Sequence, residues 1–409
     1  MNKFFLFSIV ILLNSCIGPV KELESQIQDI YFNSVTDNPP EPLPESFDNK
    51  VKVTQSWNKA FDDLPLNVEI AFKDEFFYLI SQDGVFYKID QESSDIIFTK
   101  KLNTGVDKGL FFNNNENFYF IDKNNFLIKI DDNGNFIWKT KLPNSVDLKP
   151  IFHNNQIIFK FINNNISSIN NDTGLVLWTY SRQNPPLTVN VQSPLLLADS
   201  VLYTGYPGGK VVIIDSESGA FITELTLSRS KGTSDIERTN DVAGELSVVD
   251  NLLFAVSYNG EIASFDRFSG AKIWSRKMSS YFGSTTDKIN LITAHENDSI
   301  YSFDIASGKT IWKNSDLLHR KISSPIIYGN YLLTVDYLGI LHIFNLTEGE
   351  RVAIHKFGKD FESLIDFGDS VSIKNTLNIS KIYHIKDFVY ICLNNKEIIK
   401  IQINDKVDE

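Results

Sequence analysis

The chain repeats one short cassette at an interval of about forty residues. Its clearest copy runs from Asp304, through a turn that ends at Gly308, to Trp312. The clear copies have an Asp or Asn, a tight turn closed by Gly, and a strand with Trp, and the degenerate copies keep this frame, with Ser94 in place of Gly in the first. The positions equivalent to Trp312 are 98, 138, 178, 223, 274, 312 and 353, at intervals of 40, 40, 45, 51, 38 and 41 residues. Such a period is typical of four-stranded β-propeller blades.

Each residue type of the cassette has a physical role in this interpretation. Glycine allows the positive φ that the turn requires, and Asp or Asn accepts hydrogen bonds from the following backbone. Tryptophan buries a large apolar area, which predicts a place between adjacent blades. Taken alone, these residues build a scaffold and need not bind a ligand. The predicted structural residues are Trp57, Trp138, Trp178, Trp274, Trp312, Gly174, Gly219, Gly270 and Gly308.

Tight turns at regular spacing set the number of blades. Short strands with almost no helical periodicity indicate an all-β chain. Within each repeat, two residues with a preference for positive φ separate the second and third strands. They are Asp83-Gly84, Asn124-Asn125, Asn163-Asn164, Gly208-Gly209, Asn259-Gly260, Asn297-Asp298, Leu338-Gly339 and Asn394-Asn395. We therefore expect an eight-bladed β-propeller of four-stranded antiparallel blades.

The eighth blade predicts how the ring closes. Its cassette Asn is Asn404, and an outer strand after it would extend past Glu409. Residues 51–57 form a predicted strand that belongs to none of the repeats and carries Trp57, the one tryptophan without a cassette. We expect this N-terminal strand to pair with the last blade, which would remove the open edges of a sheet that invite aggregation.

The first residues indicate export and lipidation. Lys3 precedes an apolar run, Phe4 to Leu13, that is too short to span a bilayer. Cys16 follows directly after Ser15, which resembles the lipobox of bacterial lipoproteins. The resemblance implies that Cys16 is lipidated and that Ile17 after it allows transfer to the outer membrane. A plain secretory signal with an incidental cysteine is the alternative.

Three segments follow from these observations. Residues 1–15 are predicted to be a signal peptide, and residues 16–50 a lipidated cysteine with a flexible acidic and Pro-rich tether. Residues 51–409 are predicted to be the propeller. The only membrane contact expected is the lipid anchor.

Composition argues against several other classes of protein. The net charge of −12 leaves no basic surface for nucleic acid. The six histidines form no metal-binding motif, and no cofactor or catalytic residue is predicted. With Cys16 lipidated, Cys392 has no partner for a disulfide, and its apolar strand predicts a buried, unreactive thiol.

Two insertions lengthen the repeat, at residues 228–242 and 358–380. Insertions in repeat proteins form loops on one face and often carry function, although a neutral loop is the preferred interpretation of the second. The cassettes resemble the PQQ-like propeller repeat over residues 51–404. Residues 232–242 are similar to the signature of the BamB-type lipoproteins of the outer-membrane β-barrel assembly (Bam) machinery, Gly-Ser-x-Glu-Ile-x-Arg-x-x-Asp-Val-Asp.

This resemblance implies a non-enzymatic scaffold in the outer membrane that faces the periplasm. The implied partner is the central barrel protein of the complex, bound through its POTRA domains, and unfolded outer-membrane clients are a further implied ligand. Arg238 and Asp241 match the docking signature, while Ala243 replaces its second Asp. A surface ion pair between Arg238 and Asp241, worth under about 1 kcal/mol, is the alternative. The predicted partner-binding residues are Arg238, Asp241, Glu237, Val189 and Asn190.

Two other functions share this fold. One is an unrelated periplasmic lipoprotein adaptor. The other is a quinoprotein dehydrogenase, because such enzymes use the same propeller and fold does not fix function. The enzymes resemble one another in a vicinal Cys-Cys pair, which this sequence lacks. The first function remains the preferred hypothesis.

Overall fold

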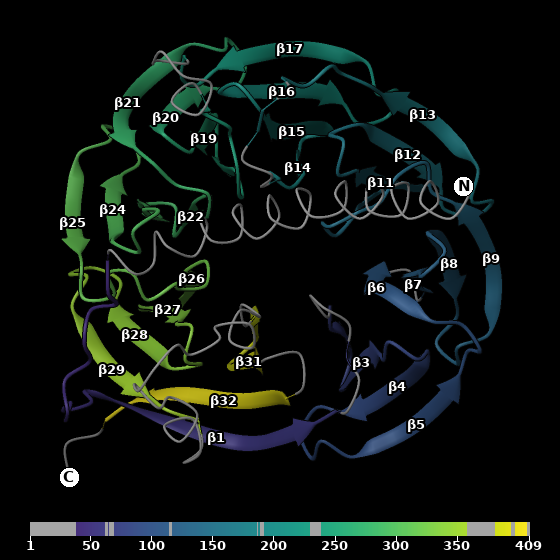
Figure 1. Ribbon diagram of the computed structural model, residues 1–409, viewed down its shortest axis with the longest axis horizontal. Coiled ribbons are helices and arrows are strands. Elements are labelled where there is room, and N and C mark those ends of the chain that lie inside the picture. Colours follow the sequence, from purple (N-terminus) through teal and green to yellow (C-terminus); the bar gives the residue numbers. More distant parts are fainter. Residues whose placement is uncertain are drawn as a thin grey trace, which may run out of the picture.

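Eight four-stranded antiparallel sheets form a closed ring in the computed structural model (Figure 1). The structure describes residues 38–61, 64, 69–113, 117–185, 187–188, 192–229, 239–357, 381–393 and 397–406. All named elements of this part are β-strands. The predicted eight-bladed β-propeller is therefore confirmed.

Apart from β1, the strands of the blades follow the order of the chain, and each blade begins with its inner strand (Figure 1). Blades one to four comprise β2 Ala71–Lys73, β3 Phe76–Ile80, β4 Val85–Asp90 and β5 Ile96–Lys101; β6 Val106–Asn113, β7 Asn117–Asp122, β8 Phe126–Ile130 and β9 Phe136–Lys141; β10 Ile151–His153, β11 Gln156–Lys160, β12 Ile166–Asn170 and β13 Val176–Tyr180; and β14 Leu196–Ala198, β15 Val201–Tyr206, β16 Lys210–Asp215 and β17 Phe221–Thr226.

The second half of the ring repeats this arrangement. Blades five to eight comprise β18 Ser247–Val249, β19 Leu252–Val256, β20 Gly260–Asp266 and β21 Lys272–Met278; β22 Thr285–Thr286, β23 Asn290–Ala294, β24 Ile300–Asp304 and β25 Thr310–Asn314; β26 Ile326–Tyr328, β27 Tyr331–Val335, β28 Leu341–Asn345 and β29 Arg351–His355; and β30 Lys381–Ile385, β31 Phe388–Leu393, β32 Glu397–Asp405 and β1 Val51–Ala60.

The predicted turns lie between the second and third strands of their blades. Each of the seven within the described residues contains at least one residue with positive φ, for example Gly84 at 84° and Asn164 at 63°. The eighth predicted turn, Asn394-Asn395, lies outside the described residues. Residues that tolerate positive φ thus end the strands where the sequence pattern expects.

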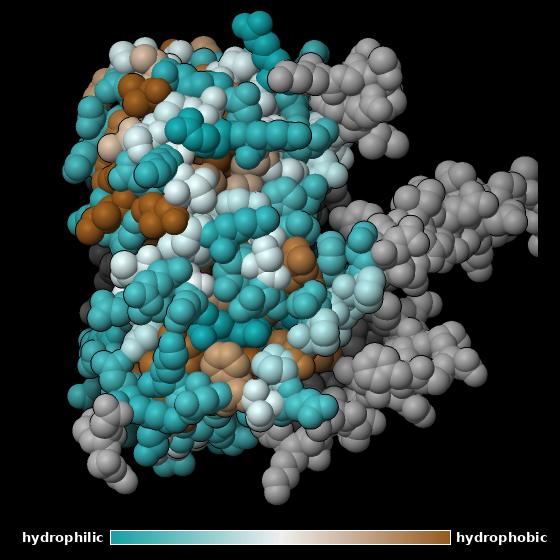
Figure 2. All heavy atoms as spheres, turned by 90° about the vertical axis from the view of Figure 1, so that its left-hand side faces the viewer, coloured by the Kyte–Doolittle hydropathy of each residue, from teal (hydrophilic) through white to brown (hydrophobic). Residues whose placement is uncertain are grey.

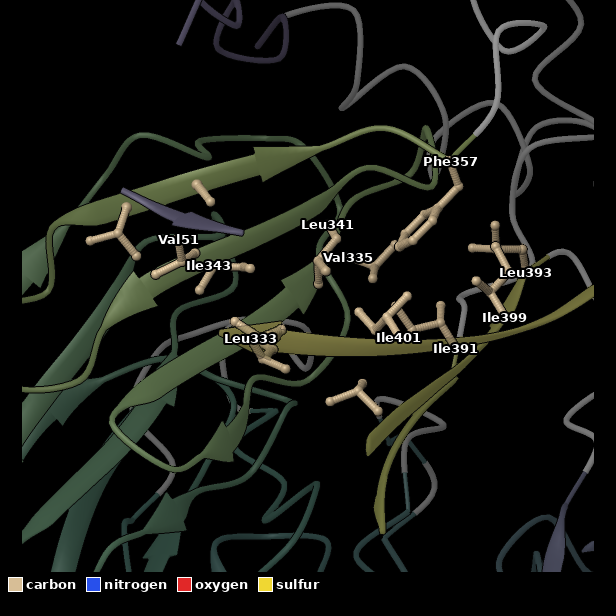
Figure 3. Close-up of a cluster of buried hydrophobic side chains, with 14 residues drawn as sticks. Val51, Leu333, Val335, Leu341, Ile343, Phe357, Ile391, Leu393, Ile399 and Ile401 are labelled. Atoms are coloured by element: carbon tan, nitrogen blue, oxygen red, sulfur yellow. The ribbon is translucent and has the colours of Figure 1, made fainter. Parts of the chain in front are cut away.

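The N-terminal strand closes the ring, as predicted. β1 lies antiparallel to β32, from Val51 opposite Asp405 to Ala60 opposite Glu397 (Figure 1). Val51 also enters an apolar cluster between blades seven and eight, where it packs with Leu333 of β27 and other buried side chains (Figure 3). The two ends of the propeller are therefore joined by a ladder and by a shared core.

The cassette tryptophans lie at the junctions between blades. Trp274 of blade five donates its indole N–H to the Ile305 carbonyl of blade six at 2.9 Å. A Cβ on Gly308, in the turn that follows Ile305, would lie 2.4 Å from the Trp274 ring. Gly308 also has φ +64°, so its lack of a side chain satisfies both the turn and the interblade packing. Trp138, Trp178 and Trp312 lie in the same way against Gly174, Gly219 and Gly349.

The outer wall of the ring exposes apolar side chains where the outer strands begin. Phe136, Leu175, Phe221 and Ile273 are more than half exposed. On the wall of blades five to seven, the largest hydrophobic groups lie toward one end of the ring (Figure 2). We call the exposed side chains of Phe136, Leu175, Phe221 and Ile273 the apolar rim.

Candidate functional site

One end of the ring carries both the blade-connecting loops and the hairpins between second and third strands. Successive strands run in opposite directions, so these two kinds of connection emerge at the same end. Contacts between them agree with this, because the His319 amide donates to the Asn297 carbonyl at 3.2 Å. We call this end the loop face. The described residues of the loops at 181–195 and 227–246 belong to connections between blades, so these parts of the two loops lie on it.

The base of the 227–246 loop is fixed by buried polar contacts. Asp241 is 3% exposed, and its carboxylate accepts the Gly208 amide at 3.1 Å. The Asp241 carbonyl accepts the Tyr258 amide at 2.9 Å, and the Val242 amide donates to the Tyr206 carbonyl at 3.2 Å. These bonds join the loop to the hairpins of blades four and five. The Asp241 side chain therefore braces the loop from inside.

The base of the 181–195 loop is held by a buried lysine. Lys160 is 2% exposed, and its ammonium donates to the Ser193 carbonyl at 3.0 Å and to the Gly205 carbonyl at 2.7 Å. Its third hydrogen reaches the Thr204 hydroxyl at 2.9 Å. Burial lowers the pKa of Lys160 to about 7. Blade three thus holds a loop that leads into blade four.

An ion cluster lies beside these two loops. Glu224 forms ion pairs with Arg182 and with Lys210. Burial alone would raise the pKa of Glu224, but the hydrogen bonds from Lys210 and Arg182 lower it below its ordinary value. The guanidinium of Arg182 also lies over the Tyr206 ring, 5.4 Å from its centroid. The carboxylate therefore stays ionised and keeps both cations in place.

The predicted docking residues have different positions relative to the described structure. Arg238, Glu237, Val189 and Asn190 lie outside the described residues, and their role stays a prediction. Asp241 is described and buried, so its carboxylate points into the protein.

Lys160 was not predicted to have a role. The signal available in the sequence was a single lysine in the otherwise apolar run Ile157-Ile158-Phe159-Lys160-Phe161. A lone charge in a strand that is buried on both sides requires polar partners. The pattern could identify this need, but the partners come from a loop more than thirty residues later.

Part of the predicted tether binds the loop face. The Glu41 amide donates to the Leu318 carbonyl at 2.9 Å, and the Glu41 carbonyl accepts Arg320 at 2.8 Å. Farther along, Asn49 exchanges two hydrogen bonds with the backbone of Ile354. Residues 41–50 thus lie along blades six and seven, and a free tether would be confined to the residues before them.

A buried ion cluster supports this attachment. Asp336 is 4% exposed and accepts two N–H groups of Arg320, at 2.9 and 2.7 Å. His342 Nε2 lies 3.1 Å from the same carboxylate oxygen. Burial would raise the pKa of Asp336, but His342 and Arg320 hold it below its ordinary value. Burial lowers the pKa of His342 more strongly than Asp336 raises it. We interpret the cluster as an Asp–Arg ion pair with a neutral histidine.

The described residues hold one buried free cysteine and no cluster of possible metal ligands. Within them, no three His, Cys, Asp or Glu side chains gather into a possible metal site. Cys392 is buried, and burial raises the pKa of its thiol to about 12, so it is poorly reactive. No helix in this same part of the chain has the length and apolar character needed to cross a membrane.

Comparison with known proteins identifies relatives of the chain. The family model described as outer membrane protein assembly factor BamB matches residues 54–314. The BamB of Yersinia pestis is 31% identical over 188 residues, which cover 46% of this chain and 48% of the relative. The BamB of Escherichia coli K12 is 32% identical over 178 residues, 44% of this chain and 45% of the relative. The chain thus spans about half the length of the curated relatives it matches.

Solved structures share the fold. The crystal structure of BamB from Moraxella catarrhalis has a TM-score of 0.73 at 20% identity, covering 86% of this chain and 100% of that one. A quinohemoprotein alcohol dehydrogenase from Comamonas testosteroni has a TM-score of 0.62 at 10% identity, covering 86% of this chain and 76% of the enzyme. At these identities the likeness shows the propeller and not the activity.

Proposed function

Because the chain belongs to the family of the outer membrane protein assembly factor BamB, we propose that it is a non-enzymatic scaffold of the Bam complex. It docks on the POTRA domains of the central barrel protein and aids the folding and insertion of β-barrel outer-membrane proteins. The observation that carries this proposal is the family match, which includes both loops of the candidate site.

The loop face supports a docking role. Two long loops emerge from neighbouring junctions, and buried contacts of Asp241 and Lys160 fix their bases. A rigid base limits the entropy that a loop loses when it binds, so affinity is gained without further contacts. Loops on a rigid scaffold are a common location for recognition residues.

Arg238→Ala is expected to weaken binding to the isolated POTRA domains by roughly 2 kcal/mol. Truncating one side of a desolvated charge pair costs about 2–5 kcal/mol, and a rim position costs less. Ala243, in place of the signature's second Asp, argues for the lower end. The measurement is a calorimetric titration of the full chain, with an unchanged melting temperature as the check on folding.

Asp241 provides the comparison within this experiment. Asp241→Ala should weaken binding and also lower stability, since it removes the hydrogen bond from the partly buried Gly208 amide to a carboxylate, and such bonds contribute about 1.5–3 kcal/mol. Asp241→Asn retains an acceptor oxygen and should lie closer to wild type. Ser218→Ala, in an exposed turn between third and fourth strands, is the control. Wild-type affinity in a well-folded Arg238→Ala protein would remove this loop from the docking site and leave the fold unaffected.

Cys16→Ser is expected to release the protein from membranes into the soluble periplasmic fraction. The proposed acyl chains provide the apolar anchor, and each buried CH₂ contributes about 0.8 kcal/mol. Fractionation after a salt wash measures the effect, with Cys392→Ser as the matched control. A Cys16→Ser protein that stays with the outer membrane, in cells that lack the barrel protein's POTRA domains, would contradict lipid anchoring.

Direct contact with unfolded clients stays a prediction of the family resemblance. The apolar rim is the described surface that best suits such ligands, because it exposes large hydrophobic side chains along several outer strands. Photo-crosslinking from Phe136 or Phe221 during outer-membrane protein synthesis tests it, and the absence of client adducts from both sites would contradict it.

A further inference from the structure

Lys160 connects the bases of the two loops through one short segment of blade four. This segment is Thr204-Gly205-Tyr206, at the end of β15. On one side, Lys160 binds the Thr204 hydroxyl and the Gly205 carbonyl, and also the Ser193 carbonyl of the first loop. On the other side, the Tyr206 carbonyl accepts the Val242 amide of the second loop. A shift of the segment would therefore move both loop bases.

The packing at this segment leaves little space for independent movement. A Cβ on Gly205 would lie 2.5 Å from Cγ1 of Val242 and 2.6 Å from its carbonyl oxygen. The Gly205 amide also donates to the Ser193 hydroxyl at 3.0 Å. The Lys160 ammonium lies 4.7 Å from the centroid of the Tyr206 ring. The residue at position 205 thus contacts the bases of both loops directly.

Another blade of the same ring makes this junction without a lysine. In blade seven, the Thr334 hydroxyl donates to the Ser323 carbonyl at 2.8 Å, and the Val335 amide donates to the Ser323 hydroxyl at 3.1 Å. Thr204, Gly205 and Ser193 make the same two bonds in blade four. The strand residue in register with Lys160 there is Ala294, which pairs with Ile300 as Lys160 pairs with Ile166. Joining two blades therefore does not require this lysine.

We propose that Lys160 is a positioning residue that holds the two loop bases in register with each other for partner docking. This inference rests on the function proposed above. Its chemistry is a cation of blade three with three oxygen acceptors: the Ser193 carbonyl of the first loop, and the Thr204 hydroxyl and Gly205 carbonyl of blade four. In this proposal Lys160 does not contact the partner. It acts through Ser193, at the base of the first loop, and through Tyr206, whose carbonyl holds the base of the second.

The hydrogen bonds that join the loop bases depend on the protonation of Lys160. A charged Lys160 has three N–H groups for its three acceptors, whereas a neutral amine has two and a lone pair. The Thr204 hydroxyl would then turn toward the amine and leave the Ser193 carbonyl. The Tyr206 ring faces Lys160, and burial raises the pKa of its hydroxyl. Arg182, which lies over the same ring, is a guanidinium, so neither group titrates in this range. Loss of the proton near pH 7 should loosen the first loop base.

The experiment compares Lys160→Met with Lys129→Met in the full chain. Lys129 is a second buried lysine, which binds the Asn171 carbonyl at 2.8 Å, in blades two and three and away from both loops. We expect Lys160→Met to bind the POTRA domains about tenfold more weakly, and Lys129→Met to bind as wild type. Between pH 6 and 8.5, wild-type affinity should fall roughly fivefold, the loss of about one hydrogen bond. The Lys160→Met profile should lack this fall.

A second readout separates this inference from the proposed function. Amide hydrogen exchange of the unbound protein should be faster at Gly205 and Val242 in Lys160→Met, and unchanged at Val335. If Lys160→Met does not fold, Thr204→Val, which removes one acceptor, should show the same change more weakly. If exchange is faster in Lys160→Met but the wild-type protein does not bind the POTRA domains, only the proposed partner would be contradicted. Unchanged exchange at both amides, or wild-type affinity and pH dependence in Lys160→Met, would overturn the role of Lys160.

Discussion

Deletion of residues 51–58 is expected to abolish the closed ring and produce aggregation or a large fall in melting temperature. The deletion removes most of β1, which lies along β32 from Val51 to Ala60. It also removes Trp57, which stacks on Phe77 of blade one at 5.6 Å and donates to the Gln91 carbonyl at 3.0 Å. Trp57 is partly buried, so losing its side chain alone should cost less than the about 3–5 kcal/mol of a fully buried tryptophan.

The backbone and the side chain can be separated by two further variants. Trp57→Ala keeps the ladder and should cost no more than the side chain, whereas the deletion also exposes the edge of β32 to intermolecular pairing. Thr54→Ala, at an exposed position of the same strand, is the control and should melt as wild type. Thermal melting with light scattering measures all three. A deleted protein that melts as a stable monomer would show that the ring does not depend on β1.

Arg320→Met is expected to destabilise the protein by about 3–5 kcal/mol. Removing one partner of a buried ion pair leaves the other charge without compensation. Asp336 would keep only His342 and backbone donors, including the Leu338 amide at 3.0 Å. The variant also loses the bond from Arg320 to the Glu41 carbonyl, so proteases should cut more readily near residue 41. Chemical denaturation and limited proteolysis measure the two effects.

The exposed pair Lys50–Glu350 is the matched control, since Lys50→Met should leave stability unchanged. The wild-type cluster also predicts acid sensitivity. The folded pKa of Asp336 is lowered, so its contribution is lost as pH falls through that value. The folded pKa of His342 is lowered too, so below about pH 6.5 the unfolded state takes up a proton first. Equal stability of wild type and Arg320→Met at neutral pH would refute the structural importance of the cluster.

The sequence predicted the ring because its signals are local. A turn such as Asn163-Asn164 depends on the conformations of its own residues, and the missing outer strand followed from counting residues after Asn404. The number of blades and the closure by β1 could therefore be deduced without any tertiary contact.

The site was less predictable because its polar residues have distant partners. Asp241 resembles an exposed docking residue by motif, yet its carboxylate accepts the Gly208 amide 33 positions earlier. Glu41 lies in a Pro-rich segment that is typical of a tether, yet Arg320 binds it from 279 positions away. The periodicity of the sequence predicts which face of a strand a residue occupies. It does not predict which polar or charged group from a distant part of the chain lies against that residue.

Closure by the first strand has a consequence for the order in which the protein can be made. Asn58 of β1 and its hydrogen-bond partner Glu397 of β32 are 339 residues apart. β1 is synthesised before any blade, and it must wait without its partner until the last blade exists. Its outward residues Lys52 and Thr54 are polar, which suits a strand that spends this time in water. Contacts of such separation form slowly, so the ring becomes protected only at the end of biosynthesis. A chain that is cut short would carry seven blades and no closure, and would be recognisable to proteases by that defect.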